Sequence, residues 1–73
     1  MDPEQVVRNL AELQVSSPVV HEDHGVGRYL GLQSLDVGNM EQEFLTIEYA
    51  RGDKLYVPVS ALHLISRYTG ASE

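Results

Sequence analysis

The chain has no cysteine and no tryptophan, and it also lacks a basic cluster and a long apolar run. Without cysteine it can form neither a disulfide framework nor a thiolate metal site, and this composition fits a reducing compartment. Its apolar runs are too short to cross a membrane. Its first residues lack the basic and apolar regions of a secretion signal. We therefore expect a cytoplasmic protein with no membrane contact.

Basic residues are scarce, since five Lys and Arg stand against eleven Asp and Glu, giving a formal net charge of −6. The five are scattered along the chain rather than clustered. Neutralisation of phosphates supplies most of the affinity of proteins for nucleic acids, so we expect no direct nucleic-acid binding. An acidic surface instead suits a partner with a basic patch.

With 73 residues the chain is one domain at most. A chain this short buries only roughly 60% of its unfolded surface, so its stability is modest. We expect a helix and linker over residues 1–15, a folded domain over 16–70 and a disordered tail over 71–73.

The N-terminal pattern predicts a helix over residues 2–13. Asp2 is a good N-cap, and Pro3 fits the first helical position, which needs no N–H. Leu10 and Leu13 fall on one apolar face together with preceding valines. So short a helix is marginal alone and must pack against other residues.

The remainder of the chain is typical of short strands joined by tight turns. We expect a helical turn over 59–62 with Ser60 as a candidate cap, and strands over 19–21, 26–37, 43–50, 54–58 and 64–68. Gly38 and Asn39 form a turn pair. These elements predict an all-β fold, a strongly bent, five-stranded SH3-like barrel with a short N-terminal helix.

Two strand patterns make specific predictions about facing. Alternation along the third strand directs Leu45, Ile47 and Tyr49 inward and Phe44, Thr46 and Glu48 outward, and the fourth strand directs Leu55 and Val57 inward. Glycines inside the second strand, Gly27 and Gly31, indicate bulges or bends.

Histidines at positions 21 and 24 form an H-x-x-H pattern. A structural zinc site needs about four converging ligands, and His63 is the only other histidine in a chain without cysteine. We therefore expect no metal site. Hydrogen bonding that fixes the turn before Gly25 is the favoured role of His21 and His24.

No other motif predicts catalysis or a cofactor. Gly25, Gly27 and Gly31 lack the Gly-Lys-Ser/Thr of a phosphate loop. Ser60 and His63 have neither an orienting acid nor an oxyanion loop. The Arg-Gly-Asp triplet at 51–53 is interpreted as a hairpin turn. We expect a binding module rather than an enzyme.

Two kinds of binding surface remain open at this point. Tyr29, Tyr49, Tyr56 and Tyr68 could line a cage for a methylated ligand or a peptide, as in small reader domains. Alternatively, Leu35 is a large apolar residue on the water-facing side of the second strand, together with Gln33 and Val37. A free strand edge pairs readily with another chain.

Four segments resemble a known family when they are taken together. They are residues 19–21, 24–29 (HGVGRY), 54–60 (KLYVPVS) and 62–68 (LHLISRY). They closely resemble the RNA polymerase-interacting domain of the CarD-like family that occurs in bacterial transcription-repair coupling factors. The resemblance covers residues 2–70, almost the whole chain.

The resemblance implies a Tudor-like or SH3-like barrel that docks on the β subunit of bacterial RNA polymerase, at its β1 (protrusion) lobe, in transcription-coupled DNA repair. Docking is by edge-strand addition. The contact residues carried over are Gln33, Ser34, Leu35, Asp36, Val37 and Tyr56. CarD-type relatives have basic residues at the positions of Leu35 and Tyr56. The resemblance also implies that the parent protein is an ATP-driven DNA translocase, and the phosphate-loop motifs of a translocase are absent from this chain.

Overall fold

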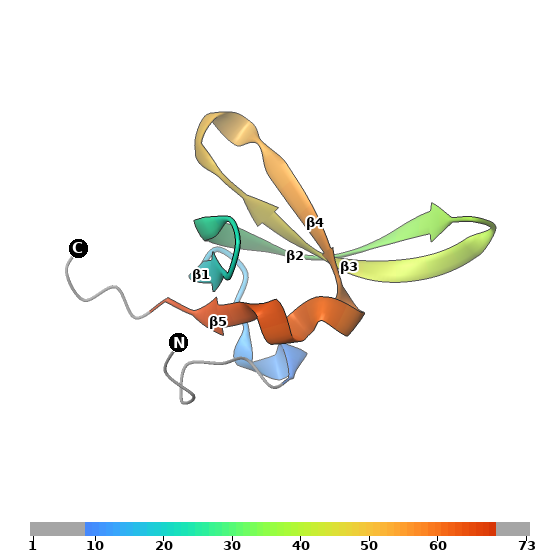
Figure 1. The fold of residues 1–73 in the computed structure, drawn as a ribbon, viewed down its shortest axis with the longest axis horizontal. Helices are drawn as coiled ribbons and strands as arrows, with labels where there is room; N and C mark the ends of the chain where they lie inside the picture. Colours follow the sequence, from blue (N-terminus) through green and yellow to red (C-terminus); the bar gives the residue numbers. More distant parts are fainter. Residues whose placement is uncertain (1–8, 69–73) are drawn as a thin grey trace.

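The structure is a computed structural model that describes residues 9–68. Its strands form one antiparallel sheet, and short 3-10 helices connect them (Figure 1). The expected all-β class is confirmed. The strands are β1 (Pro18–His21), β2 (Gly25–Val37), β3 (Met40–Glu48), β4 (Lys54–Pro58) and β5 (Ile65–Arg67), and the helices are η2 (Leu10–Glu12), η3 (Ala50–Gly52) and η4 (Val59–Leu64).

The strands lie in the order β4-β3-β2-β1-β5. Strand β2 has two neighbours along different parts of its length. Residues 25–28 pair with β1, whereas residues 28–37 pair with β3. The outer half of β2 and the start of β3 project from the remainder of the domain as a two-stranded arm (Figure 1).

The predicted irregularity of β2 is present at Gly31. The register with β3 shifts between Tyr29 and Gly31, so that Leu30 is the additional residue of a bulge. Gly31 has a φ of +112°, which side chains rarely tolerate. Beyond this bulge the pairing is regular up to Val37. The position of the bulge therefore determines which side chains share a face on the arm.

The turn between β2 and β3 is the predicted Gly38-Asn39 pair. Both residues have positive φ, +58° and +69° respectively, as a type I′ hairpin turn requires. Val37 and Met40 are directly paired on either side of it. The two-residue loop fixes the register of the whole arm.

The hydrophobic core confirms most of the predicted inward positions. Leu45, Ile47 and Val57 are buried, and Tyr49 and Leu55 are half-buried against them. The other buried apolar residues are Val19, Tyr29 and Ile65.

Thr46 alternates with Leu45 and Ile47 along β3 and points away from them as predicted, but it is buried, being only 6% exposed. It lies on the central strand β3, directly between Gly31 of β2 and Tyr56 of β4. Directly opposed side chains in a sheet lie close together, so we attribute the burial of Thr46 to the large ring of Tyr56 beside it. Alternation within a single strand does not contain this information.

The N-terminal segment differs from the predicted helix. Residues 2–8 of that prediction lie outside the described residues, and the described part is the 3-10 helix η2. Asn9 caps it, with its side-chain oxygen accepting a hydrogen bond from the Ala11 N–H at 2.9 Å. Leu10 and Leu13 pack against the core as expected.

The predicted cap at Ser60 is wrong. Helix η4 already begins at Val59, with Pro58 in the N-cap position and no side-chain capping bond. Ser60 is therefore inside the helix rather than before it. The helix also continues to Leu64, so the last strand is shorter than the predicted 64–68.

Gly27 permits a close approach of β2 to β3, which gives a prediction of stability. A Cβ added there would lie 2.5 Å from the Ile47 Cγ2 and 3.0 Å from the Glu48 carbonyl oxygen. Ile47 is fully buried in the core, so a shift of its side chain would disturb the packing around it. We expect Gly27→Ala to lower the free energy of unfolding by about 1–3 kcal/mol in urea titrations.

The control for this variant is Val26→Thr, which changes the adjacent residue where it is 49% exposed. It should alter the free energy of unfolding by less than about 0.5 kcal/mol. An unchanged midpoint for Gly27→Ala would show that the β2–β3 contact is looser than described.

Candidate protein-binding edge

Among residues 9–68, one border of β2 has no partner strand over its outer half. The inner half is covered by β1, and the coverage ends at Tyr29. There, Tyr29 donates its N–H to the Ser17 carbonyl at 2.9 Å and accepts from the Ser16 N–H at 2.7 Å. Within the described chain, residues 31–37 pair with β3 alone. Their other border is open.

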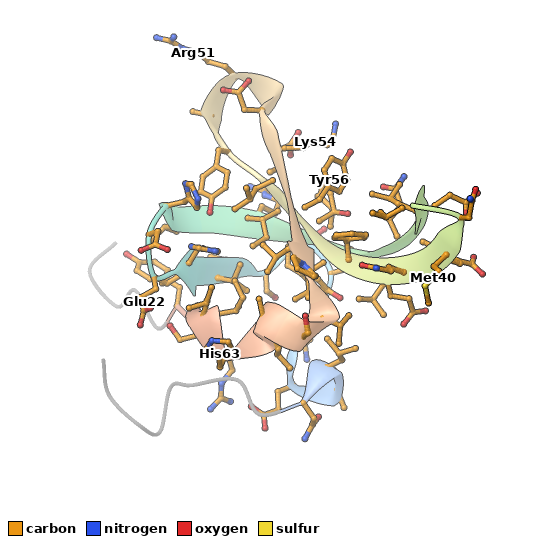
Figure 2. The ribbon with its side chains drawn as sticks, turned by 45° about the vertical axis from the view of Figure 1, so that its right-hand side comes forward. Glu22, Met40, Arg51, Lys54, Tyr56 and His63 are labelled. Carbon is orange, nitrogen blue, oxygen red and sulfur yellow. The ribbon has the colours of Figure 1, made fainter. Side chains whose placement is uncertain are left out.

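The same arm is two-stranded at its outer end. Residues 40–43 of β3 pair with β2, and pairing with β4 begins only at Phe44, opposite Pro58. We call residues 33–44 the projecting ribbon. Figure 2 shows Met40 near its outer end and Tyr56 on the neighbouring strand β4.

The two faces of the projecting ribbon differ in chemistry. Directly paired residues of antiparallel strands place their side chains on the same face. Leu45 and Ile47 point into the core. Residues 40, 42, 44 and 46 alternate with them along β3 and therefore point to the opposite side. The opposite side carries Gln33 and Gln42 together with five apolar residues, and we call it the apolar face after the latter: Leu35, Val37, Met40, Phe44 and Tyr56.

Much of the apolar face is in contact with water. Val37, Met40 and Tyr56 are 47%, 66% and 41% exposed respectively, and Leu35 and Phe44 are half-buried. Exposed apolar residues gathered on one face of a small domain are a feature of interaction sites.

The other side of the ribbon, which we call the acidic face, carries Asp36, Glu41 and Glu43. Asp36 is directly paired with Glu41, and Glu43 is paired with Ser34. Leu32 lies at the inner end of this face, where it is paired with the core residue Leu45. The three carboxylates are exposed.

The predicted contact residues occupy this region. Gln33, Ser34, Asp36 and Val37 are exposed on the open border, and Leu35 is half-buried among them. The predicted shared face of Gln33, Leu35 and Val37 agrees with the register. Tyr56 is on the same face but on β4, with β3 between it and the open border.

Met40 and Phe44 were absent from the predicted contact set, although both lie on the apolar face. The signal was available in the sequence. A two-residue Gly-Asn turn pairs Val37 with Met40, and counting back along both strands pairs Gln33 with Phe44.

His21 has the structural role that was favoured for it. It is buried, and its Nδ1 accepts a hydrogen bond from the Asp23 N–H at 3.0 Å, which fixes the turn before Gly25. Its ring lies 4.6 Å from that of His24. Among residues 9–68 there is no group of three potential metal ligands.

The four tyrosines do not converge on one cage. Tyr29 is in the core, and burial raises the pKa of both Tyr29 and Tyr49. Tyr49 donates its hydroxyl to the Gly25 carbonyl at 3.4 Å and lines a hollow of about 430 Å³. Tyr68 lines a different hollow, of about 300 Å³, and Tyr56 is on the apolar face.

The Arg-Gly-Asp triplet forms the tip of the β3–β4 hairpin, as predicted. Arg51 and Gly52 have positive φ, and the Tyr49 N–H donates to the Asp53 carbonyl at 2.7 Å to close the turn. In the described part of the chain no helix is long and apolar enough to span a membrane.

Comparison with protein families matches residues 13–69 to the CarD-like/TRCF RID domain, the RNA polymerase-interacting domain of transcription-repair coupling factors. The chain belongs to this family. Such a domain is a non-catalytic binding module. This identification agrees with the resemblance seen in the sequence.

Several transcription-repair-coupling factors are similar to this chain. The protein from Haemophilus influenzae is 59% identical and that from Escherichia coli 55% identical, each over all 73 residues of this chain. The protein from Bacillus subtilis is 38% identical over 65 residues, or 89% of this chain. The chain spans 6% of the length of each of these relatives.

The hydrogen bond of His21 gives a second prediction of stability. His21→Phe retains a ring at this buried position but removes the acceptor of the Asp23 N–H. We expect the free energy of unfolding to fall by about 1 kcal/mol in urea titrations. The matched variant His24→Phe, at an exposed position of the same turn, should cost less. Equal losses for the two variants would contradict the assigned role.

Proposed function

We propose that this domain docks on the β subunit of bacterial RNA polymerase, at its protrusion lobe, by adding residues 33–37 to a polymerase sheet. In this way it attaches the transcription-repair coupling factor to polymerase during transcription-coupled repair in the cytoplasm. The single observation that supports this proposal most strongly is the open border of β2 from residue 31 to residue 37.

The energetics of strand addition fit so small a site. Backbone hydrogen bonds contribute a net ~1 kcal/mol each and carry little sequence information, whereas side chains at alternate positions give specificity. An interface of this size is of weak to moderate affinity. Attachment to a longer protein that is already on DNA raises the effective concentration and offsets this weakness.

Leu35 is the natural anchor of such a contact. It lies in the middle of the open border, on the apolar face and next to the exposed Val37. Because it is only half-buried in the free domain, a partner can still remove substantial apolar surface from water.

The alternative of a reader domain with a tyrosine cage lacks comparable support. Its aromatic residues would have to surround one ligand. Here Tyr29 is in the core, and Tyr49 and Tyr68 line separate hollows. We therefore do not propose this function.

Leu35→Arg tests the docking proposal. A charged side chain at the centre of the apolar contact should weaken binding of the 73-residue chain to purified polymerase at least tenfold, or about 1.4 kcal/mol, in a titration. The thermal midpoint should barely move, because the substitution is outside the core.

Val26→Arg is the control, because it adds the same charge to an exposed residue of the same strand where β1 already covers the border. It should bind polymerase like the unmodified chain. Normal binding by Leu35→Arg would show that the wrong edge was assigned. Unfolding of Leu35→Arg would show that Leu35 belongs to the core.

A further inference from the structure

The two faces of the projecting ribbon restrict which strand can be added to it. A residue of an added strand lies on the same face as the β2 residue directly opposite. Residues opposite Leu35 and Val37 therefore meet the apolar face, and residues opposite Ser34 and Asp36 meet the acidic face. Successive side chains of the partner strand therefore contact the apolar face and the acidic face in turn.

The apolar face extends beyond the open border. Met40 and Phe44 continue it across β3, and Tyr56 continues it onto β4. Apolar side chains of an added strand would extend this exposed surface and cover its margin. Polar or charged side chains at those positions would instead be placed against hydrocarbon, which is unfavourable unless they find partners.

The acidic face has no basic residue of its own ribbon to balance it. The segment from residue 29 to residue 50 contains no Lys or Arg. Asp36 and Glu41 are directly opposite each other, an arrangement of like charges that destabilises a free ribbon. A cation from an added strand next to Asp36 would relieve this repulsion.

A second copy of this chain is a poor occupant of the border for the same reason. Pairing of two β2 strands would place both acidic faces on one side of the extended sheet. That arrangement would bring together the carboxylates of Asp36, Glu41 and Glu43 from the two copies.

We propose that the ribbon selects a partner strand whose side chains alternate between apolar residues and Lys or Arg, with the cations on the acidic face. This inference rests on the proposed docking to polymerase, and it adds the chemistry of the polymerase strand that is recognised. The acidic face and the apolar face both contribute to specificity.

Charge reversal on the acidic face tests this proposal. The triple variant Asp36→Lys, Glu41→Lys and Glu43→Lys should bind purified RNA polymerase at least tenfold more weakly than the unmodified chain in a titration at low salt. The binding of the unmodified chain should weaken as salt is added, and the variant should lose this dependence.

The matched control reverses three exposed acidic residues away from the ribbon, Glu22, Asp23 and Asp53, so that the net charge changes equally. It should retain binding within about threefold, because substitutions distant from the ribbon act independently of the ribbon's contacts. For the apolar face, Val37→Lys should weaken binding at least tenfold. Val26→Lys, at almost the same exposure, should not.

Each outcome bears on a different part of the proposal. Unchanged binding by the acidic-face variant, or equal weakening by the control, would overturn the selection of a basic strand while leaving polymerase docking intact. No binding by the unmodified chain would overturn both. Circular dichroism checks folding, and if the reversal unfolds, Asp36→Asn, Glu41→Gln and Glu43→Gln together should still weaken binding.

Discussion

The structure depends on a mismatch of strand lengths. Strand β2 has 13 residues, whereas its neighbour β1 has four, so β1 covers only the inner part of one border. Backbone N–H and C=O groups require partners, and an uncovered strand border in water is a template for another chain. The inner half of β2 builds the core, and the outer half is left free to bind.

The β2–β3 turn and the bulge at Gly31 convert this mismatch into a defined surface. The Gly38-Asn39 turn fixes which residues are paired, and the shift at Leu30 sets the phase of the alternation on the arm. The three carboxylates of the ribbon, Asp36, Glu41 and Glu43, therefore lie on one face, and Leu35, Val37, Met40 and Phe44 lie on the other. A slip of one residue would mix them.

Local patterns in the sequence predicted much of this fold, and neighbouring strands determine the remainder. The Gly-Asn turn, the bulge and the inward Leu45 and Ile47 follow from local rules. Burial of Thr46 depends on Tyr56 of the adjacent strand, which alternation within one strand does not show. The resemblance suggested residues 33–37, and the pairing pattern reveals their open border. The place of Phe44 on the same face could have been found from the sequence, by counting back from the Gly38-Asn39 turn.

Amide hydrogen exchange of residues 33–37, with and without purified RNA polymerase, is the most direct test of the open border. In the free chain, the amides that face away from β3 should exchange rapidly, and those of Leu45 and Ile47 should exchange slowly. Polymerase should slow exchange at the outward-facing amides of 33–37 and leave the amides of β1 unchanged. Uniformly slow exchange over 33–37 in the free chain, or no change with polymerase, would contradict the account.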